Sequence, residues 1–260
     1  MGWFLHLLQG VPVWVAGLIL AALGIAVSQL CIALAARVDH VRRRRSNELI
    51  VLALSVAAVI YAVPLALIAG EAFGDFTETR AAAAREAEEL ARAARLATAL
   101  PTAQAQAVRA GLAGYATAVI AQEWPEMARG GHPSAAEPVL RDLYRRLAEA
   151  GPSVPQARML RQLDELDTAR AERVLTVREG LIGAIWWLIG VGGLITLLLC
   201  ALYAADDLAM QRFVLALISL VITCVILLIV ATDRPFHGVP RVPPDAMRAV
   251  LALELAGATP

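Results

Sequence analysis

Residues 49–69 read LIVLALSVAAVIYAVPLALIA, an uninterrupted apolar stretch without a charged side chain. About 20 mostly apolar residues are needed to cross the roughly 30 Å of hydrocarbon in a bilayer. Three further stretches meet the same rule, at residues 11–36, 181–203 and 213–231. A buried helix of a soluble protein seldom stays uncharged over that length, so the sequence predicts an integral membrane protein with four transmembrane helices.

The composition excludes several classes of protein. The chain has 260 residues, of which 59% are hydrophobic, and its formal net charge is zero. A balanced chain has no global field to attract nucleic acid, so no nucleic-acid partner is expected. The basic residues are all Arg, which together with the abundance of Ala is typical of a bacterial genome rich in G and C. The expected location is therefore the bacterial inner membrane, as a multi-pass protein in contact with lipid.

The segment between the second and third spans has the pattern of helices exposed to water. Residues 77–100 are rich in Ala, Glu and Arg, with Arg85/Glu89 and Glu88/Arg92 at the i,i+4 spacing of ion pairs. Apolar side chains recur at helical spacing in residues 103–124, which predicts a second helix.

Two more helices are expected before the third span. One should begin with Ser134 as its N-cap and end at Gly151. The other begins near Val154, and no breaker follows before Gly180. The first and fourth helices of this segment are therefore expected to be continuous with spans two and three, with a helical hairpin packed between them.

The predicted fold class is all-α, since no stretch alternates with the period of a strand. The expected domains are the first two spans at residues 1–71, an inserted extramembrane helical bundle at 72–180, the last two spans at 181–232 and a C-terminal tail at 233–260. Within the tail, residues 245–255 are expected to form a short amphipathic helix on the membrane surface or on a neighbouring subunit.

The sequence contains no recognisable catalytic or metal-binding motif, so no enzyme is expected. His6, His40, His132 and His237 lie in separate segments, and the three Cys residues lie inside apolar blocks. Neither set has the spacing of metal ligands, so no metal and no cofactor is expected. The acidic pairs Glu88-Glu89 and Glu123 with Glu126 are interpreted as solvated helix faces, not as acid/base couples.

The segment Glu123-Trp124-Pro125 is the most unusual part of the extramembrane region. A proline disfavours the α conformation of the residue before it, so a helix is expected to end or kink at Trp124. Trp124 and Pro125 are therefore interpreted as a structural corner at which Trp124 anchors the packing. A contact of Trp124 with a ligand or another subunit is the alternative.

Span two contains the only proline within the four spans. Pro64 is expected to kink the helix, and Ile60, Pro64, Leu67 and Ile68 share one face at i,i+4 and i,i+3 spacing. These four residues are the candidate pore lining and gate, because a narrow apolar ring excludes ions by dewetting. Apolar residues facing lipid would give the same pattern.

The short link between spans one and two contains Arg37 and the run Arg42-Arg43-Arg44-Arg45. Short loops rich in Arg are retained in the cytoplasm, so this link is expected there. The helical domain and the tail would then be periplasmic. Binding of lipid headgroups is an alternative use of the same run.

The order of these features resembles the bacterial bestrophin-like family over nearly the whole chain. The resemblance is carried by Asn47-Glu48, Tyr61-Ala62-Val63, Tyr115, Glu123-Trp124-Pro125, Ala169-Arg170, Arg173, Trp187 and a tail motif, Asp233-Arg234-Pro235-Phe236-His237-Gly238. It implies similarity to bestrophins, which are homopentameric anion channels with a hydrophobic neck formed by the second membrane helix. Bestrophins hold the large segment between helices two and three in the cytoplasm, whereas the arginines of this chain predict the opposite orientation.

The leading hypothesis is a homo-oligomeric, pentameric ion channel with a modest preference for anions such as chloride. Arg80, Arg85, Arg92 and Arg95 would raise the anion concentration in a vestibule, although they also fit a solvated helix face paired with Glu86, Glu88 and Glu89. A non-conducting scaffold or sensor whose helical domain binds a partner is the main alternative. A proton-driven motor subunit fits less well, because Glu71, Asp206, Asp207 and Asp233 all lie at span ends.

Overall fold

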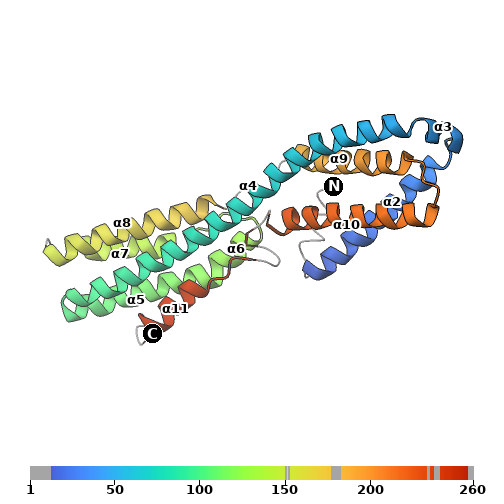
Figure 1. Cartoon of the computed structure of the whole chain (residues 1–260). Helices are drawn as coiled ribbons and strands as arrows, with labels where there is room; N and C mark the ends of the chain where they lie inside the picture. Colours follow the sequence, from blue (N-terminus) through green and yellow to red (C-terminus); the bar gives the residue numbers. More distant parts are fainter. Residues whose placement is uncertain are drawn as a thin grey trace. The chain divides into compact units, whose positions relative to one another are not determined.

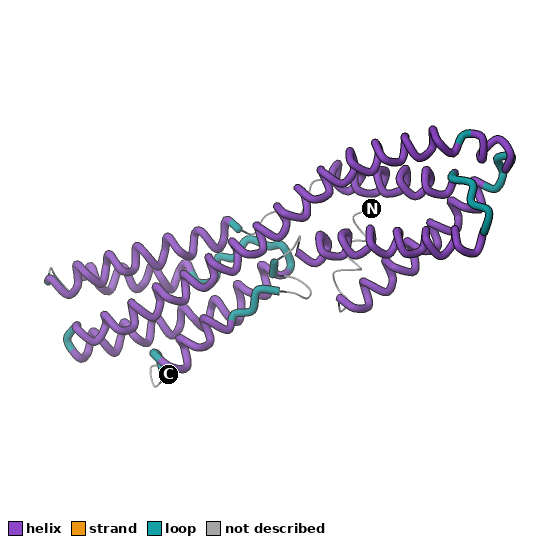
Figure 2. The backbone as a smooth tube through the Cα atoms, in the orientation of Figure 1, coloured by secondary structure: helices purple, strands orange, loops and turns teal. Residues whose placement is uncertain are grey.

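The computed structural model describes residues 13–149, 151, 153–176, 183–232, 235–236 and 241–256 (Figure 1). Helices dominate these residues, and no strand occurs among them (Figure 2). Contacts divide the chain into two compact units. The membrane unit comprises Met1–Gly74, Gly180–Asp233 and Gly238–Pro240, and the polar unit comprises Asp75–Glu179, Arg234–His237 and Arg241–Pro260. The all-α prediction is confirmed.

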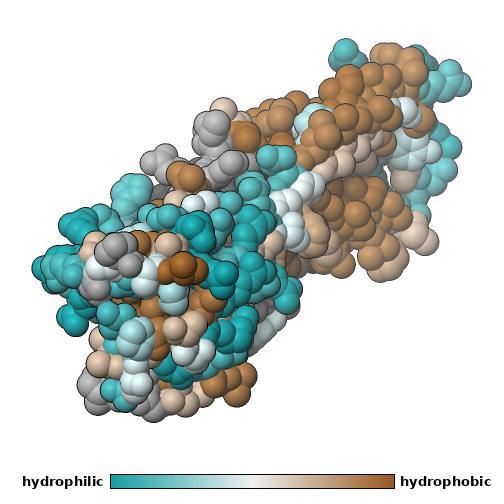
Figure 3. Space-filling view, turned by 90° about the vertical axis from the view of Figure 1, so that its left-hand side faces the viewer, coloured by the Kyte–Doolittle hydropathy of each residue, from teal (hydrophilic) through white to brown (hydrophobic). Residues whose placement is uncertain are grey.

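The membrane unit is built from the four predicted spans. They are the helices α2 (Val13–Ala35), α4 (Asn47–Leu96), α9 (Gly183–Leu202) and α10 (Leu208–Thr232), and the short α3 (His40–Arg45) holds the Arg-rich link. Each of the four long helices is apolar enough to cross a membrane. A bilayer offers no water to backbone amides, and a helix satisfies them internally. Hydrophobic and hydrophilic side chains accordingly gather on different parts of the surface (Figure 3). The protein is a multi-pass membrane protein.

Small residues let α2 and α10 approach closely. A Cβ atom added at Gly24 would lie 2.7 Å from both the Ser219 and the Thr223 hydroxyl oxygens. Gly24 and Ser28 on α2, like Ser219 and Thr223 on α10, are four residues apart, the spacing at which small residues favour contact between membrane helices. This packing face was not predicted from the sequence, because a face of small residues and a face toward lipid are both uncharged.

Hydrogen bonds from side chains to backbone join the remaining spans. The Tyr61 hydroxyl of α4 donates to the carbonyl of Ile189 in α9 at 3.0 Å. Its ring occupies the space beside Gly192, where no larger side chain fits. At the end of the same helix pair, the Asn47 side chain donates to the Ala204 carbonyl at 3.1 Å and accepts from the Ala204 amide at 3.0 Å. These bonds fix the face that α4 turns toward α9.

The polar unit is a helical bundle. Besides the C-terminal part of α4, it contains α5 (Thr102–Ala118), a π-helical segment η2 (Val119–Glu123), α6 (Trp124–Ala128), α7 (Glu137–Glu149), α8 (Val154–Leu175) and α11 (Asp245–Leu253), with a 3-10 turn, η1, at Ala97–Ala99. Its core is built from alanines and leucines of these helices, with Tyr115, Met159 and Met247. As predicted, α4 continues without a break from the second span into this unit. The predicted continuity into the third span falls on residues 177–182, which lie outside the described residues.

Two sequence expectations about the polar unit need correction. The third extramembrane helix begins at Glu137, after a turn, and not with Ser134 as its N-cap. The tail helix α11 does not present its apolar face to lipid or to another subunit, because it packs on α5 and buries Met247 in the core of this unit. The helix end near Gly151 is confirmed by the positive φ of 85° at that glycine.

Substituting Gly192 with Ala should destabilise the membrane unit. The added methyl group would overlap the Tyr61 ring and displace its hydroxyl from Ile189, and such overpacking costs about 1–3 kcal/mol. Gly190→Ala is the matched control on the same helix, since a Cβ there meets no described atom within 4 Å. Thermal unfolding in mild detergent measures both variants. An equal loss of stability in the two would show that Tyr61 does not pack as described.

Candidate pore face and a buried ion network

The membrane stretch of α4 is the least buried of the four spans. Only 11% of it is buried within the chain, compared with 22% for α2, 39% for α9 and 28% for α10. A helix that contacts so little of its own chain leaves most of its surface for lipid or for other copies of the protein. The outer face of α4 is therefore the first candidate for a functional surface.

Exposed apolar residues form a continuous stripe along this face, which we call the outer stripe. Its members lie three or four residues apart, the spacing that keeps side chains on one face of a helix. They are Leu49, Leu52, Val56, Ile60, Val63, Leu67 and Gly70. Leu67 and Ile60 are 70% and 67% exposed. No charged residue interrupts the stripe.

The four predicted pore residues do not all lie on the outer stripe. Ile60 and Leu67 do, whereas Ile68 packs against the cluster formed by Trp186, Ile229 and their neighbours. Eight residues rotate a helix by about 80° beyond two full turns, which turns Ile68 away from Ile60. Pro64 is half-buried between these two faces, and its missing N–H leaves the Ile60 carbonyl without its usual helical partner.

A network of buried ion pairs lies at the centre of the polar unit. The Arg173 side chain is fully buried and bridges two fully buried carboxylates, Glu86 of α4 and Glu123 of η2. Its guanidinium donates to Glu123 at 2.6 Å and to Glu86 at 3.2 Å, with a second, shorter bond to Glu86. One arginine of α8 therefore ties together two other helical segments.

A second arginine and a tyrosine complete the network. Arg170 donates to Glu123 at 2.7 Å, and the Tyr115 hydroxyl donates to Glu86 at 2.5 Å. Glu123 also accepts from the Ala136 amide at 3.0 Å. Two guanidinium groups thus face two carboxylates, and the buried charges balance. A balanced, hydrogen-bonded network is the form in which charges are tolerated in a protein interior.

The interpretation of Glu123 as part of a solvated helix face was wrong, and so was that of Glu86 as a partner for arginines of its own helix. On a single helix, a carboxylate that faces water and one that faces a buried arginine of another helix give the same sequence pattern. The signal that identifies the network is the pair Arg170 and Arg173, placed three residues apart on the side of α8 that also carries the buried Leu166 and Ala169.

Trp124 lies beside this network and holds the tail. The Arg173 guanidinium carbon lies 5.1 Å from its ring centroid, and its indole N–H donates to the Val242 carbonyl at 3.0 Å. Phe236 packs edge-on against the ring, with centroids 5.6 Å apart. Trp124 therefore packs against both the network and the tail. Of the tail motif, Pro235 accepts from the Val242 amide at 2.7 Å, and Asp233 lies outside the described residues.

Of the two outcomes expected at Trp124, an end or a kink of the helix, the end does not occur. Trp124 keeps helical dihedrals, and Pro125 lies in the first turn of α6. The π-helical turn of η2 directly precedes it, and such a turn accommodates a residue that lacks an N–H. The helix ends at Gly130, which has a positive φ of 74°. The Gly130 amide donates a hydrogen bond to the Met127 carbonyl, and the Gly131 amide donates one to the Glu126 carbonyl.

Hydrogen bonding in the network changes the pKa of Glu123. Burial alone would raise the pKa of this carboxyl, but the hydrogen bonds from Arg170 and Arg173 outweigh burial and lower it. Burial and the neighbouring Glu86 raise the pKa of Tyr115 well above its ordinary value, so its hydroxyl stays a donor. Because the folded pKa of Glu123 is depressed, its stabilising effect is complete above the ordinary glutamate pKa and is lost as the pH falls through the folded value.

The four arginines proposed for a vestibule are exposed, but three of them are already paired. Arg85 pairs with Glu172 of α8, and Arg95 pairs with Glu254 after α11 at 2.9 Å. Arg92 pairs with Glu88 as predicted and with Glu89 at 3.1 Å, so the predicted Arg85/Glu89 pair does not form. Arg80 is exposed and pairs with none of the described residues.

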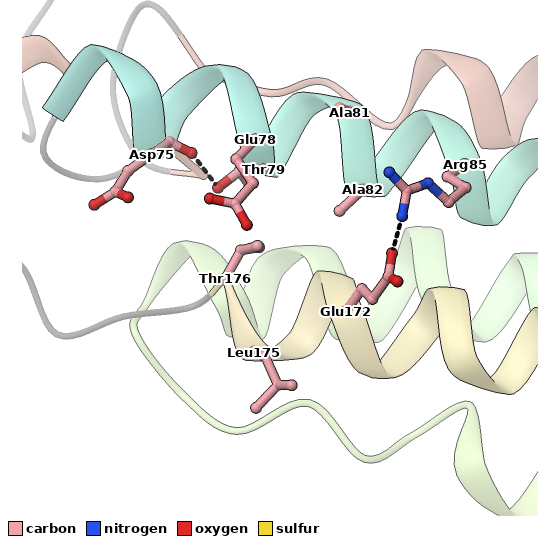
Figure 4. A pocket seen from close by; sticks show the side chains of 9 residues that line it. All are labelled: Asp75, Glu78, Thr79, Ala81, Ala82, Arg85, Glu172, Leu175 and Thr176. Carbon is pink, nitrogen blue, oxygen red and sulfur yellow. Dashed lines mark hydrogen bonds and ion pairs between the residues drawn. The ribbon is translucent and has the colours of Figure 1, made fainter. Parts of the chain in front are cut away.

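A pocket of about 380 Å³ lies between α4 and α8 in the polar unit (Figure 4). Asp75, Glu78 and Thr79 line one part of it, and the Arg85–Glu172 ion pair lines another. Among the described residues, no group of three or more His, Cys, Asp or Glu side chains is placed to hold a metal ion. The pocket therefore offers mixed charge without the ligand set of a metal centre.

Replacing Arg173 with Met should unfold the polar unit more readily than any exposed change. It would leave Glu86 and Glu123 buried with too few donors, a defect that costs about 3–5 kcal/mol. Arg141→Met is the control, since Arg141 pairs with Glu137 on the exposed side of α7 and should change stability little. Chemical denaturation followed by circular dichroism measures both. Equal effects would contradict a buried network.

Several of the residues that carry the family resemblance join helices to one another. In the membrane unit Asn47 and Tyr61 bond to backbone groups outside α4, and in the polar unit Tyr115, Glu123, Arg170 and Arg173 form the buried network. Trp187, in contrast, is exposed. The motif residues therefore specify how this fold packs.

Comparison with known proteins agrees with that geometry. The fold is similar to crystal structures of a bacterial bestrophin homologue from Klebsiella pneumoniae. A variant of it matches with a TM-score of 0.69 at 14% identity, covering 93% of this chain and 98% of that one. Another variant matches with a TM-score of 0.69 at 16% identity, covering 95% of this chain and 97% of that one. The structure phased by Zn-SAD matches with a TM-score of 0.66 at 16% identity, covering 93% of this chain and 97% of that one. No curated protein matches the sequence.

A family model gives the assignment directly. The model of the bestrophin-like domain matches residues 21–247, which is most of the chain. The resemblance seen in the sequence is thereby confirmed, and the chain belongs to the bestrophin-like family.

Proposed function

We propose that this chain assembles into a homopentameric ion channel of the bacterial inner membrane, with a pore lined by the outer stripe of α4. The observation that carries the proposal is the exposure of this stripe on the least buried of the four spans. The family resemblance supports both the number of copies and the choice of helix. Five copies of an apolar stripe around one axis form a narrow hydrophobic neck.

The gate in this proposal is a ring of apolar side chains. Ile60, Val63 and Leu67 from each copy face the axis, and a narrow ring of this kind excludes water and ions without a charged plug. Ile68 no longer belongs to the lining, because it packs within its own chain. Pro64 acts on the pore indirectly, by weakening the helical hydrogen bonding next to Ile60.

The preference for anions is modest in this proposal. The resemblance to bestrophins supports anions such as chloride as permeant ions. Arg85, Arg92 and Arg95, which were expected to concentrate anions, have their charges balanced by glutamates. A paired arginine contributes little net field at a pore entrance, so selectivity should be weak.

Replacing Leu67 with Ser should raise conductance or leak. The hydroxyl hydrates the ring and lowers the barrier to ions. Val221→Ser is the control, because Val221 of α10 is 66% exposed, close to the 70% of Leu67, but lies on another span. Currents from purified protein in planar bilayers under a chloride gradient measure the effect, and native mass spectrometry first verifies a pentamer.

Two results would count against the channel. If native mass spectrometry showed only monomer, no pore could form between copies, and the channel hypothesis would be excluded. Unchanged currents for Leu67→Ser in an assembled protein would show that α4 does not form the gate. An assembled protein with no current at all would favour the non-conducting scaffold, whose rigid helical domain binds a partner.

The orientation we propose places the link with α3 in the cytoplasm and the polar unit in the periplasm. Arginines fill α3, and none of its residues is buried. Single cysteines at Ser46 and Ser134, in a background without Cys31, Cys200 and Cys224, test this on intact spheroplasts with an impermeant maleimide. Labelling at Ser134 alone is the expected result, and labelling at Ser46 alone would reverse the orientation.

A further inference from the structure

The charges along α4 are one-sided where its apolar stretch ends. From residue 46 to residue 79 the chain contains no basic residue, and the first charged residue after the outer stripe is Glu71. Glu71 is exposed and pairs with none of the described residues. The first arginine after Glu71 is Arg80, nine residues further along α4, so no basic residue next to Glu71 on this helix neutralises its charge.

Glu71 lies on the same side of α4 as the outer stripe. It follows Leu67 by four residues, which corresponds to a rotation of about 40° around the helix. The stripe reaches Gly70 directly before it, within the membrane unit. Any surface that brings the Leu67 side chains of several copies together therefore brings their Glu71 carboxylates near the same axis.

The two glycines that flank Glu71 favour such an approach. Gly70 and Gly74 are exposed, and a Cβ atom added to either would meet no described atom within 4 Å. Their Gly-x-x-x-Gly spacing permits close contact between membrane helices. No bulky side chain of these positions separates the Glu71 carboxylate from a neighbouring copy.

We propose that Glu71 is a selectivity-determining residue: one carboxylate from each copy forms a ring at the end of the apolar neck. This inference rests on the proposed channel. A ring of carboxylates attracts cations and repels anions. Three of the four arginines that follow Glu71 on α4 are paired with acids, so their charges do not cancel the ring. Glu71 therefore opposes the anion preference and keeps it modest.

The test is the reversal potential of reconstituted channels under a tenfold KCl gradient, for which perfect selectivity corresponds to about 59 mV. Glu71→Gln should raise the ratio of chloride to potassium permeability by about threefold or more, and Glu71→Arg should raise it further. Glu137→Gln is the control, since it removes the same charge from the exposed start of α7 and should leave the ratio unchanged.

A second arm covers a failure of these variants to assemble. Glu71→Cys, in a background without the native cysteines, is modified after assembly with a positively or a negatively charged methanethiosulfonate. The positive reagent should raise the chloride-to-potassium ratio, and the negative reagent should lower it. A chloride-to-potassium permeability ratio that changes with neither the substitutions nor the reagents would overturn the role of Glu71. An assembled wild-type protein without any current would instead overturn the channel itself.

Discussion

An apolar side chain within a bilayer can face its own chain, lipid or another protein, but it cannot face water at no cost. The helix α4 contacts its own chain least of the four spans, and its outer stripe is unbroken by charge from Leu49 to Gly70. What covers this stripe decides what the protein does. If lipid covers it, the chain is an anchored helical bundle, and if copies of the chain surround a common axis, the same stripe is the wall of a neck.

The residues that fix the fold and the residues that would carry ions are different sets. In the membrane unit, hydrogen bonds from Tyr61 and Asn47 hold the N-terminal part of α4 to Ile189 of α9 and to Ala204 just after it. In the polar unit, the ion pair between Arg173 and Glu86 holds the C-terminal part of α4 to α8, and Arg173 also pairs with Glu123. Both sets of contacts orient the helix and leave the outer stripe uncovered. The motif residues therefore have to be particular residue types, because they form particular hydrogen bonds and ion pairs. The stripe can be an ordinary row of Leu, Val and Ile, because a hydrophobic neck needs only bulky apolar side chains at the right spacing.

The sequence predicted the four spans, the continuous helix α4 and most of the helices of the polar unit, because apolar length and helical periodicity are local signals. It did not predict the network around Arg173, since ion pairs between distant helices leave no fixed spacing, and Glu86 and Glu123 looked like solvated residues. The approach of Gly24 to Ser219 was hidden for a related reason, as small residues are as uncharged as lipid-facing ones. Ile68 lies off the outer stripe because successive i,i+4 steps accumulate rotation over two turns, and the tail helix packs on α5 of its own chain.

The central claim is that the outer stripe of α4 lines a conducting pore, and cysteine accessibility tests it most directly. Single cysteines at Ile60, Val63 and Leu67, and at Val221 for comparison, would be introduced into a chain without native cysteines. A charged methanethiosulfonate would then be applied while current is recorded. The account predicts that modification at the three α4 positions changes the current and that Val221 does not respond. Currents that are insensitive at all three α4 positions, in channels that still conduct, would contradict it.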